Sequence, residues 1–168
     1  MSSKVRKPRH EMPKQAPDMR TKNFEEVALG YTEDLAVAEA TRCIGCPKKP
    51  CVAGCPVGVD IPEFISLIAE GDFLGAARKI KAKNSLPAMC GRVCPQESQC
   101  EAVCTLGKKG DPVAIGALER FCADYERVHG EPLAKAEPSD SSLGKVAVVG
   151  SGPAGSTCAA ELNRLGYK

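Results

Sequence analysis

Apolar residues recur at helical spacing through the middle of the chain, and they predict a mainly α-helical protein. Between residues 60 and 83 they fall on one face of two successive helices, with Gly71 at the junction and Asp60 and Asp72 as candidate N-caps. The apolar positions on that face are Ile61, Ile65, Ile68, Phe73, Ala76, Ala77 and Ile80. The pattern therefore predicts a helical hairpin in this region.

Two further helices are predicted on either side of the hairpin. Thr32 can cap a helix over residues 33–42, which has acids in its first turn and Arg42 in its last. A longer helix is predicted over residues 113–128. Its inward stripe consists of Ile115, Leu118, Cys122 and Tyr125. Glu119 lies on that same apolar face, and an acid in such a position needs a reason.

The two ends of the chain have a different character. Residues 1–22 contain prolines among charges and few apolar residues, so this arm is expected to lack regular structure unless a partner orders it. The first apolar anchors are expected to be Phe24, Val27 and Leu29. Residues 130–144 are rich in Pro, Ser, Gly and charge, and they predict a linker. Residues 145–149 are a short apolar, β-branched run that predicts a strand.

Composition and charge narrow the function classes. Apolar residues make up 43% of the 168 residues but aromatic residues only 4%, so a large aromatic core is not expected. The formal charge of +2 is nearly balanced, and prolines and acids interrupt the basic residues of the N-terminal arm, which favours a solvated arm over a nucleic-acid site. No stretch approaches the roughly 18 apolar residues of a membrane span, and the polar N-terminus lacks the apolar core of a secretion signal. We therefore expect a cytoplasmic protein that binds neither nucleic acid nor membrane.

Eight of the ten cysteines lie between residues 43 and 104, in two runs of four. The first run reads C-x2-C-x4-C-x3-C-P and the second reads C-x3-C-x5-C-x3-C. Such short, irregular spacings are typical of thiolate ligation of iron–sulfur clusters, and clustered cysteines without a secretion signal argue against disulfides. Structural zinc sites usually use paired C-x2-C knuckles, and only Cys43 and Cys46 form one here. We therefore predict two clusters joined by ligands that cross between the runs.

Spacing alone leaves one ligand position open. Cys43, Cys46 and Cys51 can hold the first cluster, and Pro56 directs Cys55 outward to the second. The second run then supplies one crossing cysteine to the first cluster and two cysteines to the second cluster. The candidates for the remaining position are Cys90, Glu119 and Cys122.

A glycine-rich turn follows the predicted strand and opens a helix, which is the context in which such a turn binds the pyrophosphate of a dinucleotide. The turn consists of Gly150, Ser151, Gly152, Pro153, Ala154 and Gly155. Cys158 on the following helix is interpreted as a packing residue. The acid that binds the ribose, about 20 residues past the motif, would lie at or beyond Lys168. The chain is therefore expected to be the front part of a longer protein.

With both motifs present in this order, the sequence resembles the N-terminal part of the glutamate synthase small (β) subunit family. The resemblance covers roughly residues 24–168 and rests on the two cysteine runs, on PVAIGALERF at 112–121 and on KVAVVGSGPAG at 145–155. That family includes the large subunit of the NADH-dependent ferredoxin:NADP⁺ oxidoreductase, and the N-terminal region of dihydropyrimidine dehydrogenase is similar.

The resemblance implies an α-helical ferredoxin domain with two [4Fe-4S] clusters at residues 23–129. It also implies that residues 145–168 are the truncated start of a Rossmann-type domain, which binds FAD and, with the rest of the protein, NADPH. Carried over by position, the ligands of one cluster would be Cys43, Cys46, Cys51 and Cys104, and those of the other would be Cys55, Cys94, Cys100 and Glu119. Cys90 and Cys122 would then not be ligands.

The function implied is that of a module in an NAD(P)H-dependent oxidoreductase. Electrons would pass between the flavin and a partner subunit, such as a synthase large subunit, through the two clusters. No residue of the chain is expected to act as acid, base or nucleophile, and the chain alone is not expected to be catalytically complete. The alternative from another class is a zinc-stabilised helical docking module without a redox role.

Overall fold

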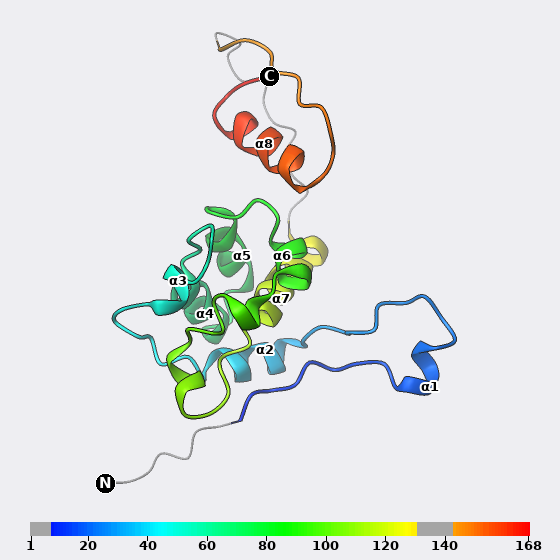
Figure 1. Cartoon of the computed structure of the whole chain (residues 1–168), viewed down its shortest axis with the longest axis vertical. Coiled ribbons are helices and arrows are strands. Elements are labelled where there is room, and N and C mark those ends of the chain that lie inside the picture. Colours follow the sequence, from blue (N-terminus) through cyan, green and yellow to red (C-terminus); the bar gives the residue numbers. More distant parts are fainter. Residues whose placement is uncertain (1–7, 131–142) are drawn as a thin grey trace. The chain divides into compact units, whose positions relative to one another are not determined.

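Helices form nearly all of the regular structure in residues 8–130 and 143–168, which are the residues that this computed structural model describes (Figure 1). They are α1 (Pro17–Arg20), α2 (Glu33–Ala40), α3 (Pro50–Ala53), α4 (Ile61–Ala69), α5 (Phe73–Lys81), α6 (Pro87–Val93), α7 (Ile115–His129) and α8 (Pro153–Arg164), with 3-10 segments at Gln96–Ser98 and Thr105–Lys108. No strand occurs in the described ranges, so the prediction of a mainly α-helical protein is confirmed there. The chain divides into two units, residues 1–128 and 129–168.

The predicted helical hairpin is present as α4 and α5, which pack against each other. Gly71 has a left-handed φ of +83°, which lets the chain reverse between them. Asp72 caps α5 as predicted, by accepting a hydrogen bond from the backbone N–H of Gly75 at 2.8 Å. The predicted capping role of Asp60 is wrong, because its side chain accepts no such bond. Pro62 occupies the second position of α4 and has no N–H to offer.

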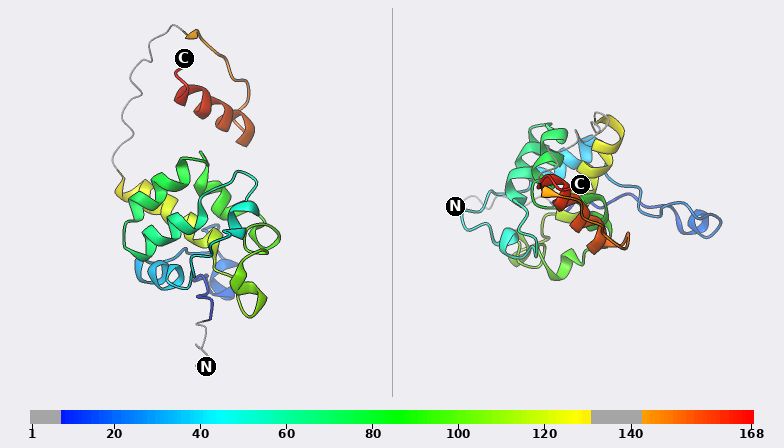
Figure 2. Two further views of the ribbon diagram at one scale, coloured as in Figure 1. Left: turned by 90° about the vertical axis from the view of Figure 1, so that its left-hand side faces the viewer. Right: turned by 90° about the horizontal axis from the view of Figure 1, so that it is seen from above.

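The core of the larger unit is built by α2, α4, α5 and α7, which Figure 2 shows gathered into one body. Its fully buried apolar side chains include Phe64, Ile65, Ile68, Ile80 and Leu118. Burial of each such side chain stabilises the fold by about 1.5–3 kcal/mol. The predicted inward stripe of α7 is confirmed at Ile115, Leu118 and Cys122, which are all buried. The apolar face of α7 is therefore fixed, and with it the direction of Glu119.

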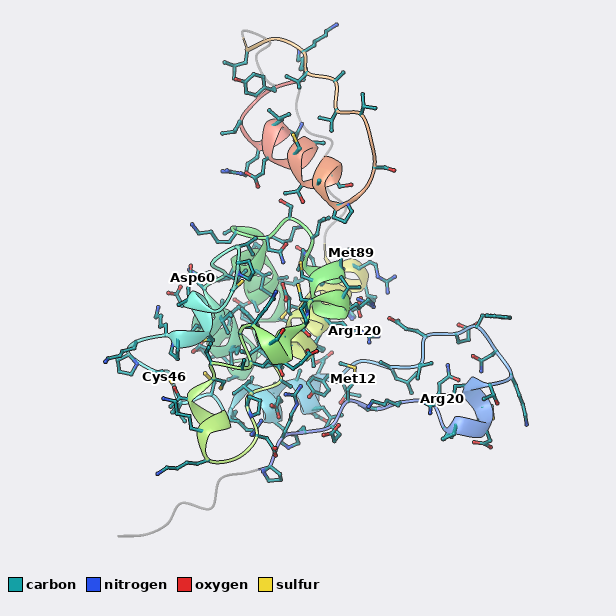
Figure 3. All side chains as sticks on the ribbon, in the orientation of Figure 1. Met12, Arg20, Cys46, Asp60, Met89 and Arg120 are labelled. Atoms are coloured by element: carbon teal, nitrogen blue, oxygen red, sulfur yellow. The ribbon has the colours of Figure 1, made fainter. Side chains whose placement is uncertain are left out.

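The N-terminal arm differs from its prediction. Residues 1–7 lie outside the described residues, but residues 8–22 do not lack regular structure, since they include α1 and one side of a long loop. The backbone N–H of Gln15 donates to the carbonyl of Val27 at 2.9 Å, and this bond joins the two sides of the loop. Figure 3 shows Arg20 at the tip of this loop and Met12 at its base, near Arg120.

Buried charges hold the base of the arm on the helices. Arg9 forms an ion pair with Glu101 at 2.6 Å, and Arg120 donates to the carbonyl of Ala28 at 2.8 Å. These partners are 92 residues apart in the sequence in both cases, so a local pattern cannot reveal them. The expected apolar anchors are wrong, because those side chains are exposed and the arm is held through its backbone and charges. They are Phe24, Val27 and Leu29.

Two buried acids cap the N-terminal end of α7 from distant segments. Glu39 of α2 accepts a hydrogen bond from the backbone N–H of Ala114 at 2.8 Å, and Glu101 accepts one from the N–H of Gly116 at 3.1 Å. The first N–H groups of a helix have no partner within it, and a negative charge is stabilised at that end. These contacts position the helix that carries Glu119.

The smaller unit contains α8, which was predicted, but residues 145–149 do not form the predicted strand. A strand needs a neighbour along its length, and only its first residues find one here. The N–H of Val146 donates to the carbonyl of Lys168 at 2.7 Å, and the N–H of Lys168 donates to the carbonyl of Gly144 at 3.3 Å. Two bonds that flank residue 145 in this way follow the pattern of a parallel pair. In both units, none of the helices described is long and apolar enough to cross a membrane.

Candidate metal centres

Four of the predicted ligands surround one cavity of the larger unit, called cavity one here. They are Cys43, Cys46, Cys51 and Cys104. The cavity encloses about 380 Å³, including space open to solvent, and apolar side chains such as Ile65 and Leu106 complete its wall. The thiol of Cys46 also lies within hydrogen-bonding distance of the Thr105 hydroxyl, at 3.2 Å. Cavity one therefore joins the first cysteine run to the last cysteine of the second run.

The other predicted ligands line a second cavity, called cavity two. They are Cys55, Cys94, Cys100 and Glu119. This cavity encloses about 570 Å³ and also draws on both runs, because Cys55 comes from the first run and its other thiols from the second. Cys90 lines the same cavity and adds a fifth donor. The structure thus brings together each set of four that the resemblance implied, while Cys90 remains a competitor of Glu119.

Glycines allow the close approaches that assemble these cavities. A Cβ atom on Gly54 would lie 2.7 Å from the side chain of Val103 and 3.0 Å from the carbonyl of Gln99, so the two cysteine runs meet at this point. A Cβ atom on Gly91 would lie 2.6 Å from the backbone nitrogen of Arg120. Distances under 3 Å leave no room for a larger residue. The contact at Gly91 holds α6, which carries Cys90, directly against α7 beside Glu119.

Glu119 is a half-buried acid whose carboxylate accepts a hydrogen bond from the amide of Asn84 at 2.8 Å. Burial raises the pKa of Glu119 to about 7, and the hydrogen bond from Asn84 opposes this shift. Among the described residues it forms no ion pair. A bound cation would supply the counter-charge that its carboxylate lacks.

The thiols of both cavities are suited to a ligand that carries its own positive charge. Burial raises the pKa of Cys51 to about 11 and that of Cys100 to about 12, and it also raises the pKa of Cys43. Metal ligation requires thiolates, so these groups give up protons when a metal binds. In the described ranges, no three His, Cys, Asp or Glu side chains stand close enough together to hold a single metal ion. The donors line the walls of the two cavities.

The two cavities share part of their walls. Ile61 of α4 and Ile115 of α7 line both of them, and both side chains are buried. Ile65 lines only cavity one, whereas Phe64 lines only cavity two. The two cavities therefore have the apolar side chains of Ile61 and Ile115 in common, and this pair is called the partition here.

A comparison with models of protein families matches residues 20–131 to the family described as dihydropyrimidine dehydrogenase domain II, 4Fe-4S cluster. The chain belongs to this family. The match includes every donor that lines the two cavities, so both cavities lie within a 4Fe-4S cluster domain.

Relatives of known annotation agree with the family. The chain is 40% identical over 144 residues to the NAD-dependent dihydropyrimidine dehydrogenase subunit PreT of Escherichia coli strain K12, which covers 86% of this chain and 34% of that protein. It is 40% identical over 151 residues to the glutamate synthase [NADPH] small chain of Halomonas elongata, covering 89% of this chain and 31% of the relative. The chain is also 37% identical over 158 residues to the glutamate synthase [NADPH] small chain of E. coli strain K12, covering 93% of this chain and 33% of that relative. The chain thus spans about a third of the length of these oxidoreductase subunits, and the predicted resemblance is confirmed.

The two remaining cysteines of this 4Fe-4S family member line neither cavity. Cys122 is fully buried in the core and lines neither cavity, and Cys158 is exposed on α8. Sequence reasoning missed Asn84, which lies between a lysine-rich helix end and a proline and carries no motif. Its role becomes visible only through its contacts in cavity two.

The predicted dinucleotide turn has the local geometry that its glycines suggest. Gly150 has a φ of +109°, which side-chain-bearing residues rarely adopt, and a Cβ atom on Gly155 would lie 2.1 Å from the carbonyl oxygen of Gly150. Gly152 is the N-cap residue of α8 and has open space around it. A third glycine that permits close packing of turn and helix is a feature of dinucleotide-binding turns.

Proposed function

We propose that the larger unit holds two [4Fe-4S] clusters and transfers electrons within an NAD(P)H-dependent, FAD-containing oxidoreductase. The observation that carries this proposal is that two cavities each collect at least four donors from distant parts of the chain. Cavity one would be ligated by Cys43, Cys46, Cys51 and Cys104, and cavity two by Cys55, Cys94, Cys100 and Glu119.

When bound, such clusters supply one-electron carriers whose potentials depend on burial and hydrogen bonding. The residues of this chain contribute position and insulation. Cysteines from both runs line each site, and the shared apolar side chains of Ile61 and Ile115 place the two sites next to each other. The thiol of Cys46, beside Thr105, and that of Cys43, beside the N–H of Gly45, have neighbours that adjust the electron density on sulfur.

Iron and acid-labile sulfide per chain, measured on anaerobically purified protein, test this proposal. We expect about eight of each, with an electron paramagnetic resonance (EPR) signal from each cluster after reduction. About four of each would limit the unit to one cluster. Zinc in place of iron would support the alternative of a docking module without a redox role.

We further propose that the smaller unit begins a Rossmann-type FAD-binding domain. The glycine-rich turn, the helix α8 that follows it, and the parallel pairing around residue 145 support this proposal. NADPH oxidation and a partner subunit are proposed for the whole protein, because relatives three times as long are named NADPH-dependent small chains and a dehydrogenase subunit.

The flavin proposal is tested with Gly155→Ala in the full-length protein. The added methyl group would collide with the carbonyl of Gly150, so the turn must open and lose its fit to pyrophosphate. We expect loss of bound FAD, seen in the absorbance of the purified protein, with iron content unchanged. Full FAD occupancy in this variant would argue against a role of the turn in flavin binding.

A further inference from the structure

Two side chains in cavity two can complete the ligand set of the cluster proposed there. Cys55, Cys94 and Cys100 leave one position, and both Glu119 and Cys90 line the same cavity. A thiolate is the usual ligand of an iron–sulfur cluster, and a carboxylate is a harder one. The structure therefore needs a feature that favours the acid over the nearby thiol.

Asn84 contacts both competitors through its side-chain amide. This residue is buried and lines cavity two. Its Oδ1 accepts a hydrogen bond from the backbone N–H of Leu86 at 3.0 Å, which fixes the orientation of the amide. The Nδ2 group must then face Glu119, and it donates to Oε1 of that residue at 2.8 Å. The thiol of Cys90 donates to the same Oδ1, with 3.7 Å between sulfur and oxygen.

We propose that Asn84 selects Glu119, and not Cys90, as the fourth protein ligand of the cluster in cavity two. This inference rests on the proposed function, because it assumes a cluster in that cavity. The donated hydrogen bond holds one carboxylate oxygen and leaves Oε2 for iron. The hydrogen bond from the Cys90 thiol to Oδ1 of Asn84 holds that sulfur beside the amide and occupies it there. Asn84 is thus a positioning residue that acts through both neighbours.

The surrounding contacts fix the relative positions of Asn84, Cys90 and Glu119. The side-chain amide of Gln96 donates to the carbonyl of Cys90 at 2.9 Å. The close approach of Gly91 to the backbone of Arg120 fixes α6 against α7. Because α6 and α7 are held against each other in this way, we expect a change at Asn84 to alter the choice of ligand more readily than it alters the fold.

The test compares Asn84→Asp, Asn84→Ala and the double variant Asn84→Ala/Cys90→Ala. Aspartate keeps an oxygen for Leu86 and Cys90 but cannot donate to Glu119 and repels its carboxylate, so it separates positioning from a purely structural role. Alanine frees both competitors, and Cys90 then replaces Glu119 at the iron while its proton passes to solvent, without any change of oxidation state. Gln99→Glu is the matched control, because Gln99 lines cavity two and makes no side-chain hydrogen bond in the described part of the chain.

We expect both single variants at Asn84 to change the EPR g-values and the midpoint potential of one cluster, with the other cluster as wild type. Iron content should be retained in Asn84→Ala and fall in the double variant, which lacks both the positioned acid and the spare thiol. Gln99→Glu adds a charge to the lining of cavity two without touching the hydrogen bonds of Asn84, so it should not reproduce the g-values of Asn84→Asp. Far-UV circular dichroism and the unchanged signal of the first cluster report on folding in each variant.

The inference is overturned if both Asn84 variants have wild-type g-values, or if the double variant keeps as much iron as Cys90→Ala. It is also overturned if Gln99→Glu reproduces the spectrum of Asn84→Asp, since added charge alone would then explain the change. A wild-type protein with only one cluster would instead contradict the proposed function, so the two failures are distinguishable.

Discussion

The buried acids of the larger unit differ in what balances their charge. Glu39 pairs with Arg42 at 2.5 Å and Glu101 pairs with Arg9 at 2.6 Å, so both are neutralised within the chain. Among the residues that the structure describes, Glu119 has only the amide of Asn84 as a hydrogen-bond donor. A buried charge without a counter-charge is costly, and the unbalanced acid is the one that lies among cysteines. This contrast separates the acids that stabilise the fold from the acid proposed as a ligand.

Replacement of Glu119 is predicted to affect one cluster only. Glu119→Ala removes the proposed carboxylate ligand from cavity two and leaves cavity one untouched, so one of the two proposed reduced-cluster EPR signals should change or disappear. Cys90→Ala is the matched control and should leave both signals intact, because its thiol is engaged by Asn84. Two undisturbed signals in the Glu119 variant would remove it from the ligand set.

Glu39→Ala is predicted to lower the free energy of unfolding by about 3–5 kcal/mol, because it removes the carboxylate that neutralises the buried Arg42. It also removes the acceptor for the N–H groups of Ala114 and His10. Glu33→Ala, an exposed change on the same helix, should cost less than about 1 kcal/mol. Urea denaturation of both variants, compared at equal cluster content, measures the two changes in the free energy of unfolding. Equal midpoints for the two variants would contradict the buried network.

At the level of single residues, the metal-ligand donors could be predicted from the sequence. The residues that support them could not. Cysteine has few roles in a chain of this kind, so its spacing indicates a ligand directly. Asn84 and Glu39 belong to common residue types, and their partners lie 35 and 75 residues away in the sequence. No local pattern carries that information.

Among the elements, helices with a regular apolar face were predicted with nearly correct bounds. The hairpin of α4 and α5 is an example, because periodicity and the glycine at position 71 are local signals. The predictions that failed depend on distant partners. Residues 145–149 are not a strand because a strand requires a neighbour, and the arm before Thr32 forms ion pairs with α6 and α7 through Glu26.

The contact between α6 and α7 gives a prediction at the same scale. Alanine at Gly91 would gain about 1 kcal/mol in helix propensity, but its methyl group would lie within 2.6–2.8 Å of Arg120, and overpacking of this kind costs about 1–3 kcal/mol. We therefore expect Gly91→Ala to lower the denaturation midpoint and the iron content together. Gly110→Ala, at a position with nothing within 4 Å, should change neither. Wild-type stability in Gly91→Ala would mean that the helices can separate freely at this contact.

For the larger unit as a whole, the main consequence of the fold is the shared partition. The two cysteine runs are separate in sequence, yet they combine to form two cavities that share the side chains of Ile61 and Ile115. The sequence indicated that ligands cross between the runs, but not which side chains the two cavities would share. Those residues come from two helices whose packing is a tertiary feature.

The partition predicts that one substitution can affect both clusters. Ile115→Ala opens a wall common to both cavities, so water or altered packing should shift the midpoint potentials of both clusters. Ile65→Ala removes the same atoms from a wall of cavity one alone, and only one potential should shift. Each change costs about 2–5 kcal/mol of stability, so the loss of packing is matched and the pattern of shifts carries the test. Potentiometric titration followed by EPR measures the two clusters separately, and a shift confined to one cluster in Ile115→Ala would show that the partition does not couple the sites.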